Sequence, residues 1–170
     1  MKILGITGGS GSGKTTLLRA VEQLGGLGLD CDAIYHHLLE TDDALVAAIG
    51  ARFPGTVRDG RVDRPALAAV VFADPAELAA LDALTHEAVA REVRRRLWQS
   101  EAPFAAIDAI GLFESGLAAL CDETVCVLAP EEMRIERLIR RDGISRERAL
   151  ARIRAQKSDE ALRAQCGHAL

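Results

Sequence analysis

The sequence lacks the features that mark zinc-binding, redox-active and membrane-spanning proteins. Four of its 170 residues are cysteines, and no two of them form the C-x-x-C pair of a zinc knuckle or a thioredoxin-type site. No apolar stretch approaches the roughly 20 residues that a membrane-spanning helix needs. A strand-like run begins within two residues of Met1, which leaves no room for a signal peptide. We therefore expect a cytoplasmic protein that does not act at a membrane.

The chain also lacks the excess of basic residues that is typical of nucleic-acid-binding proteins. Its formal net charge is −4, which argues against nucleic acid as the main ligand. Its apolar fraction of 49% is ample for a core, and 27% charged residues is ordinary for a globular enzyme. A length of 170 residues suits one domain with a small insertion. We expect a monomer that acts on a small molecule.

The most informative motif is a glycine loop near the N-terminus. Residues 8–15 read Gly-Gly-Ser-Gly-Ser-Gly-Lys-Thr, which matches G-x-x-x-x-G-K-[ST] at every position. An apolar run at 3–6 precedes it and a helix-like segment at 15–21 follows, and this context indicates a phosphate-binding loop rather than an ordinary turn. Backbone N–H groups and the helix N-terminus would hold the phosphates, Lys14 would reach the β- and γ-phosphates, and Thr15 would bind Mg²⁺. The residues expected to bind the nucleotide are Gly9, Gly11, Ser12, Gly13, Lys14, Thr15 and Thr16.

Continuous apolar runs predict the strands. Runs at residues 2–6, 104–108 and 124–128, with a shorter one at 27–29, are typical of buried parallel strands. Helical patterns separate them, so we predict an α/β fold, a P-loop core with a parallel sheet flanked by helices.

The middle of the chain breaks this alternation, and we predict no strand between Asp32 and Ser100. Asp63-Arg64-Pro65 and Asp74-Pro75 are typical helix starts. Apolar residues recur at helical spacing from Leu78 to Leu97, with a possible break at 85–87, and Trp98 is expected to pack this helix or to line an acceptor pocket. We therefore expect one domain, 1–170, with a core at about 1–31 and 101–170 and a helical acceptor-binding insertion at about 32–100.

A second helical segment, 131–156, is rich in arginine. Asp142-Gly143 interrupts it, and Ser145 is placed to cap the helix that follows. A helical pair of this kind can close over a polyphosphate as a lid, which we place at about 140–156. The alternative is a solvated face with i,i+4 pairs such as Glu136 with Arg140.

Acidic residues follow two of the predicted strands. Asp30 and Asp32 end the second strand and Asp108 ends the third, at the sheet edge where ligands gather. Asp32 is expected to orient an acceptor hydroxyl or take its proton. Asp30 would hold the metal or brace the loop, although either residue could instead cap the next helix. Asp108 stands at a position able to hold Mg²⁺.

Taken together, the motifs resemble those of the dephospho-CoA kinase family over nearly the whole chain. The matching segments are Thr7–Thr16, Asp30–Asp32, Asp63–Leu67, Val71–Pro75, Thr85–His86, Leu112–Gly116, Arg140–Gly143 and Arg152–Gln156. The resemblance implies transfer of the ATP γ-phosphate to the ribose 3′-hydroxyl of dephospho-CoA, the last step of coenzyme A synthesis, with ATP and Mg²⁺ as cofactors.

The resemblance also implies roles for individual residues. Asp32 would be the catalytic base, assisted by Lys14 and Arg140. The residues expected at the acceptor are Asp30, His36, Phe72, His86, Leu112, Phe113 and Glu114. His36 stands where the family usually has arginine. The family usually continues beyond the end of this sequence into a strand, a turn and a helix, so part of the adenine pocket is expected to be missing or built differently.

Three alternatives remain open at this point. The first is another small-molecule or nucleotide kinase of the P-loop class, which would differ in its acceptor pocket. The second is a P-loop GTPase or metal-insertion chaperone. Residues 108–111 spell D-x-x-G as in GTPases, but the sequence has neither N-K-x-D nor a Cys/His cluster. The third is an inactive nucleotide-binding protein.

Overall fold

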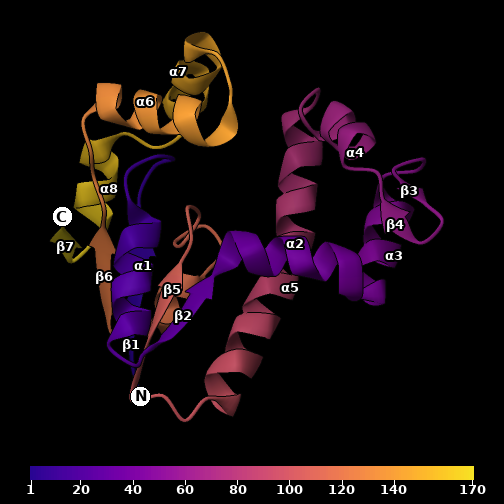
Figure 1. The fold of residues 1–170 in the computed structure, drawn as a ribbon. Coiled ribbons are helices and arrows are strands. Elements are labelled where there is room, and N and C mark those ends of the chain that lie inside the picture. The colour runs from indigo at the N-terminus through magenta and orange to yellow at the C-terminus, as the bar shows by residue number, and fades with distance from the viewer. The chain divides into compact units, whose positions relative to one another are not determined.

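The computed structural model describes residues 1–170 and divides them into two compact units. The first unit comprises Met1–Asp30 and Ser100–Leu170, and the second comprises Cys31–Gln99 (Figure 1). No helix combines the length and the hydrophobicity that would let it cross a membrane.

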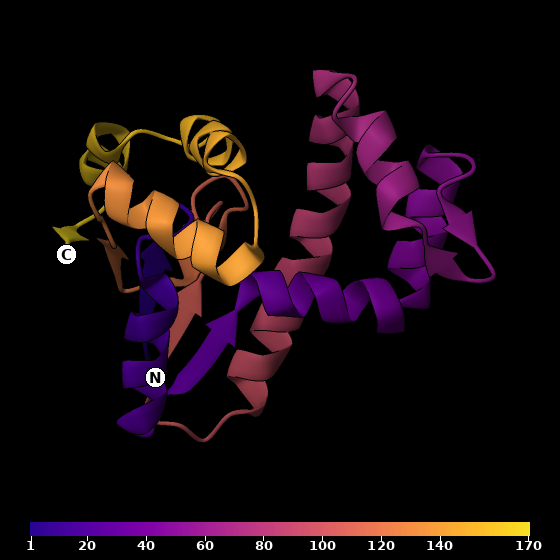
Figure 2. The ribbon, with the colours of Figure 1, turned by 45° about the horizontal axis from the view of Figure 1, so that its top comes forward.

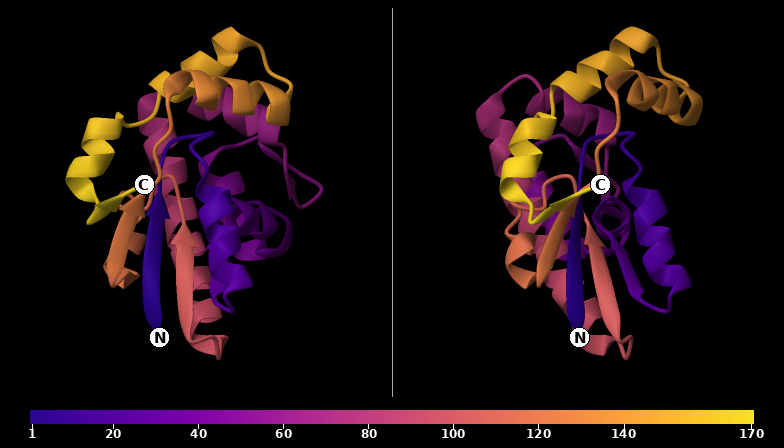
Figure 3. Two further views of the ribbon diagram at one scale, coloured as in Figure 1. Left: turned by 60° about the vertical axis from the view of Figure 1, so that its left-hand side comes forward. Right: turned by 90° about the vertical axis from the view of Figure 1, so that its left-hand side faces the viewer.

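The first unit contains a five-stranded parallel sheet with the order β2-β5-β1-β6-β7. Its strands are β1 (Lys2–Thr7), β2 (Leu27–Asp30), β5 (Phe104–Asp108), β6 (Glu123–Cys126) and β7 (His168–Ala169). Figure 3 shows β1, β5 and β6 side by side. The four predicted strands are confirmed, although β6 starts one residue earlier and ends two residues earlier than expected. The short β7 was not predicted, and it extends the sheet beyond β6.

The helices of the first unit are α1 (Lys14–Gln23), α6 (Glu131–Asp142), α7 (Arg146–Arg154) and α8 (Asp159–Gln165), with a short 3-10 turn at Leu117–Leu120 (Figure 2). The apolar face of α1 packs on the sheet, where Leu18 and Val21 contact a buried cluster that includes Ile6. Burial of these side chains, each worth about 1.5–3 kcal/mol, fixes the helix that follows the glycine loop.

Helices α6 and α7 form a separate small core. It consists of Ile135, Leu138, Ala149 and Ile153. The expected interruption is confirmed, because α6 ends at Asp142 and is followed by Gly143, whose φ of 64° is left-handed and therefore suits glycine. The predicted cap is confirmed as well, since the Ser145 hydroxyl accepts a hydrogen bond from the Arg148 amide at 3.3 Å.

The second unit is mainly helical, with α2 (Cys31–Thr41), α3 (Asp43–Arg52), α4 (Arg64–Val71) and α5 (Pro75–Gln99). The Asp63 carboxylate caps α4 by accepting the Ala66 amide at 3.1 Å, with Pro65 in the first turn. The Asp74 carboxylate accepts the Ala76 amide at 2.8 Å next to the start of α5. Both predicted helix starts are therefore confirmed.

Three expectations for this unit were wrong. Strands β3 (Val57–Arg58) and β4 (Arg61–Val62) form an antiparallel hairpin, and strands of two residues are too short to show alternating hydrophobicity. The predicted break in α5 is absent, because the Thr85 hydroxyl donates to the Leu81 carbonyl at 2.9 Å within the continuous helix. Trp98 does not pack α5 against a neighbour, since it is 87% exposed.

Candidate active site

The glycine loop between β1 and α1 has a backbone that only glycine adopts readily. Gly8, Gly11 and Gly13 have φ angles of 145°, 78° and 115°, in the region that a Cβ atom disfavours. A Cβ on Gly8 would also collide with the Val127 carbonyl oxygen, and one on Gly9 would collide with the Arg134 guanidinium. The loop is thus both turned and tightly enclosed.

The glycine loop carries a buried polar atom that suits a phosphate ligand. The Ser12 side-chain oxygen is buried and has no hydrogen-bond partner within the protein. Such an orphaned group is costly unless a ligand or water satisfies it. Gly13 caps α1 without a side-chain hydrogen bond, so the positive end of the helix is not blocked by a capping side chain. The residues present therefore fit a nucleotide phosphate.

Acidic residues meet at the same edge of the sheet. Asp30 ends β2 and is the register partner of Asp108, which ends β5 and is 6% exposed. Asp108 is in turn the partner of Ile6 on β1, next to the start of the glycine loop. Thr15 lies exposed in the first turn of α1. The chain has no group of three or more His, Cys, Asp or Glu side chains that could hold a metal by themselves. Asp30, Asp108 and Thr15 fit a Mg²⁺ site, because Mg²⁺ usually takes one or two protein carboxylates together with substrate phosphates.

Two arginines of α6 and a glutamine after α7 hold the glycine loop from outside. Buried Arg134 donates from Nε to the Ser10 carbonyl at 3.0 Å. Arg137 donates from Nη1 to the carbonyls of Gly11 and Ser12 at 2.9 and 3.0 Å. Gln156 accepts the Ser10 amide at 2.8 Å and donates to the Ser10 hydroxyl at 2.8 Å. In this arrangement these three side chains shape the loop.

Sequence reasoning missed these three roles. The arginine-rich segment was expected to face phosphate, but Arg134 and Arg137 face the backbone of the loop. The sequence signal that could have indicated this is the spacing of Arg134 and Arg137, because residues three apart lie on one helix face. Leu138, which is buried in the small core of α6 and α7, lies next to Arg137 in the chain. Arg140, which we expected at the phosphate, is exposed on α6.

The Leu112–Gly116 loop follows β5 and is anchored by its own contacts. Leu112 is fully buried, and its side chain packs close to Gly5 of β1. The Ser115 hydroxyl donates to the Gly111 carbonyl at 2.6 Å. Phe113 is half-buried and Glu114 is exposed, so these two side chains are the ones that the loop offers at its surface.

The other expected acceptor residues belong to the second unit. Asp32 lies exposed in the first turn of α2, directly after the carboxyl end of β2. His36 follows on the same helix, where its ring lies 5.4 Å from that of Tyr35. Phe72 is 78% exposed at the end of α4, and His86 is half-buried on α5.

The second unit also contains a cavity of about 790 Å³. It is lined by Leu39, Glu40, Thr41 and the segment 61–65. That segment includes the Asp63-Arg64-Pro65 motif, and two of its side chains are arginines. Its volume is within the usual range for small-molecule sites, and its lining carries two arginines together with the carboxylates of Glu40 and Asp63.

The fold and the glycine loop define the class of protein. A parallel sheet whose central strand leads through G-x-x-x-x-G-K-T into a helix, with carboxylates at the ends of neighbouring strands, is the architecture of P-loop nucleotide-binding proteins.

Comparisons with known proteins narrow this class. The family model described as dephospho-CoA kinase matches residues 2–169. A dephospho-CoA kinase of Thermus thermophilus is 40% identical over 158 residues, which cover 93% of this chain and 76% of that protein. A crystal structure from Thermus thermophilus matches with a TM-score of 0.86 and 39% identity over 99% of this chain and 87% of that one. The chain belongs to the dephospho-CoA kinase family.

A more distant solved structure shares the fold. It is a dephospho-CoA kinase from Campylobacter jejuni with a TM-score of 0.66 and 23% identity. The match covers 100% of this chain and 88% of that one.

Proposed function

We propose that this protein transfers the γ-phosphate of ATP to the ribose 3′-hydroxyl of dephospho-CoA, which yields coenzyme A in the last step of its synthesis. The observation that carries this proposal is the family match over residues 2–169, in a chain whose phosphate-binding loop fits its pattern without a mismatch. The alternatives of a GTPase, a metal-insertion chaperone or a kinase for another acceptor have no comparable support.

The glycine loop is the donor site. Backbone amides of Gly9 and of residues 11–16 hold the phosphates, and the orphaned Ser12 hydroxyl supplies a further hydrogen bond. Lys14 neutralises charge that builds up on the phosphates during transfer. Thr15 and Asp108, with Asp30 beside them, would hold Mg²⁺, which supplies charge neutralisation on the phosphate oxygens when bound.

Asp32 is the group that we assign to the acceptor hydroxyl. It follows the strand end that carries Asp30, at the sheet edge where ligands of α/β proteins bind. It lies exposed in the first turn of α2. An ionised carboxylate can accept the hydroxyl hydrogen and orient the oxygen for in-line attack.

The remaining acceptor contacts are assigned by position. The family resemblance assigns Phe72, His36 and His86 to the acceptor, and it assigns Phe113 and Glu114 to the acceptor as well. The cavity of the second unit has the volume for a small molecule. Helices in the range 140–156 would act as a lid whose Arg140 approaches the phosphates and whose closure excludes water.

A direct assay tests the proposal. The purified chain is incubated with ATP, Mg²⁺ and dephospho-CoA, and coenzyme A is measured by mass spectrometry. We expect product with the natural chain and none with Lys14→Ala, whose fold is checked by circular dichroism. Nucleosides and nucleotides are offered as competing acceptors, and faster phosphorylation of one of them would overturn the assignment. Size-exclusion chromatography tests the further proposal of a monomer, which we expect to act in the cytoplasm without a macromolecular partner.

A further inference from the structure

Two consecutive residues between α7 and α8 contact two different loops of the catalytic edge. Gln156 contacts the glycine loop, and Lys157 contacts the Leu112–Gly116 loop. We propose that Gln156 and Lys157 form a positioning element that ties the glycine loop (the donor loop) to the Leu112–Gly116 loop (the acceptor-side loop). This element keeps phosphoryl transfer coupled to the acceptor. This inference rests on the proposed function, in which these loops serve ATP and dephospho-CoA respectively.

The contacts of Gln156 use both ends of its carboxamide. Its oxygen accepts the Ser10 amide at 2.8 Å and Arg134 Nη2 at 3.3 Å, while its nitrogen donates to the Ser10 hydroxyl at 2.8 Å. Arg134 also holds the Ser10 carbonyl. Ser10 is 8% exposed, so these hydrogen bonds replace water around a buried loop residue. The amide, carbonyl and hydroxyl of Ser10 are therefore all fixed from one side.

The contacts of Lys157 lead in the other direction. Its ammonium forms an ion pair with the Glu114 carboxylate and lies 5.9 Å from the centre of the Phe113 ring. It also donates to the Gln165 side chain at 2.7 Å, at the end of α8. Glu114 and Phe113 are the two side chains that the acceptor-side loop offers at its surface. A single cation thus restrains both of them.

The two loops leave neighbouring strands, and a hydrogen bond joins the last residue of β1 to the segment that follows β5. Strand β1 leads into the glycine loop and β5 leads into the acceptor-side loop, and these strands pair in register. The Thr7 hydroxyl donates to the Ile110 carbonyl at 3.1 Å. Because consecutive Cα atoms are about 3.8 Å apart, the backbones of Gln156 and Lys157 stay close together while their side chains hold the two loops. A displacement at one loop is therefore passed to the other.

The function of such a tie is relative placement of donor and acceptor. Phosphoryl transfer depends mainly on alignment, and errors near 1 Å cost large factors in rate. If the acceptor-side loop moves while the donor loop still holds ATP, water can replace the missing hydroxyl. Loss of the tie is therefore expected to lower the yield of coenzyme A per ATP consumed.

The kinetic test compares coenzyme A formed with ADP formed. For Lys157→Ala we expect kcat/KM for dephospho-CoA to fall by about 5-fold, which is the scale of one exposed ion pair. The KM for ATP should stay within about 2-fold of its natural value. The ratio of coenzyme A formed to ADP formed should fall. The conservative Lys157→Arg, which keeps a cation beside Glu114, should recover most of this loss. Arg163→Ala, which removes an exposed cation on α8, is the matched control. An unchanged product ratio in Lys157→Ala, or a Lys157→Arg variant no better than Lys157→Ala, would overturn the proposal.

Hydrogen exchange supplies a second test that does not need acceptor activity. Gln156→Met keeps the side-chain volume and removes its polar contacts, and it should speed exchange in residues 8–13 and also in 110–116. Lys157→Ala should likewise speed exchange in both segments. Faster exchange confined to the loop that each residue contacts would refute the tie. A natural chain that forms no coenzyme A would instead contradict the proposed function, and the exchange result would still decide this inference.

Discussion

Asp30 and Asp108 are register partners at the carboxyl ends of β2 and β5. Neighbouring strands lie about 4.8 Å apart, so two carboxylates share a small region of the sheet edge beside the glycine loop. Two carboxylates at one sheet edge suit a divalent cation such as Mg²⁺, which usually takes one or two protein carboxylates. The arrangement explains why two acidic residues from distant parts of the chain occur at this edge.

This relationship predicts a change in metal dependence. Asp108→Asn is expected to raise the Mg²⁺ concentration needed for half-maximal activity by about 10-fold or more, because it removes the buried carboxylate next to the loop. Asp30→Asn should have a smaller effect. The measurement is a Mg²⁺ titration of coenzyme A formation at saturating ATP. An identical titration curve for Asp108→Asn would exclude this residue from the metal site.

A second prediction concerns the acceptor hydroxyl. Asp32→Asn keeps the size of the side chain and removes its basicity, so kcat should fall by about 10²-fold or more. The affinity for ATP should change little, because Asp32 is not assigned to the donor site. Steady-state kinetics and ATP binding by calorimetry check the two parts. Near-normal turnover would refute the assigned role, and Asp43→Asn, on the exposed start of α3, serves as the control.

A third prediction separates the arginines of α6. Arg134→Met removes hydrogen bonds to the buried Ser10 carbonyl and to Gln156, so the free energy of unfolding should fall by about 2 kcal/mol and the KM for ATP should rise. Arg140→Met, at an exposed position, should keep the stability of the natural chain but lower kcat. Urea denaturation and steady-state kinetics measure these effects. Equal losses of stability in both variants would contradict the distinction.

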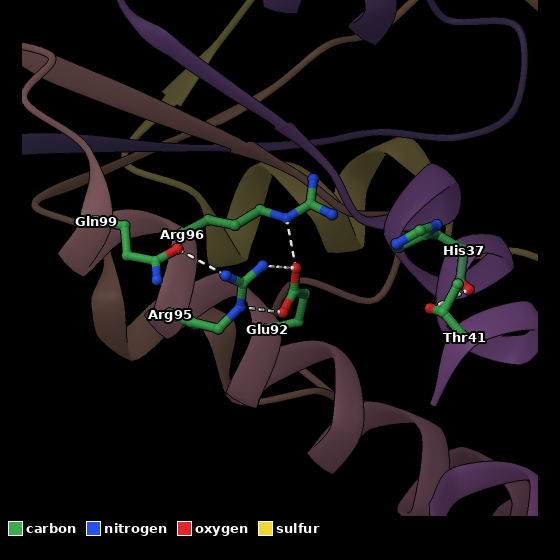
Figure 4. Close-up of polar contacts among 6 residues, drawn as sticks. All are labelled: His37, Thr41, Glu92, Arg95, Arg96 and Gln99. Atoms are coloured by element: carbon green, nitrogen blue, oxygen red, sulfur yellow. Dashed lines mark hydrogen bonds and ion pairs between the residues drawn. The ribbon is translucent and has the colours of Figure 1, made fainter. Parts of the chain in front are cut away.

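A fourth prediction concerns pH and the C-terminal half of α5. Glu92 accepts hydrogen bonds from Arg95 and Arg96, each at 2.7 Å (Figure 4). The hydrogen bond from Arg95, with that from Arg96, lowers the pKa of Glu92 from 4.5 to about 2. Because the pKa is lower in the folded state, this stabilisation is complete above pH 4.5 and is lost as the pH falls toward 2.

Glu92→Gln should therefore reduce the free energy of unfolding by on the order of 1 kcal/mol at pH 7, and by much less near pH 2. Urea denaturation at several pH values measures the difference. Glu87→Gln, at an exposed position on the same helix, is the control for the substitution itself. A constant difference between Glu92→Gln and the natural chain would contradict the cause assigned to the low pKa.

Local sequence patterns were enough to predict the main features of the fold. The glycine loop was found because its backbone needs glycine at set positions, and Gly8, Gly11 and Gly13 do have positive φ angles. The strands at the centre of the sheet were found because a strand buried on both faces is a continuous apolar run. The caps at Asp63 and Ser145 were found because capping involves residues three apart in the chain.

The sequence by itself thus determined the P-loop, the main strands and the family. Only the tertiary structure showed that Arg134 and Gln156 hold Ser10, and that Lys157 restrains Glu114. In the first two of these contacts, the partners lie 124 and 146 positions apart in the chain. Helical periodicity can indicate which face of a helix is buried, but it cannot indicate which atoms that face contacts. Those partners are set by how the α6–α7 pair packs beside the sheet, because hydrogen bonds depend on distances and directions that arise only when distant segments are brought together.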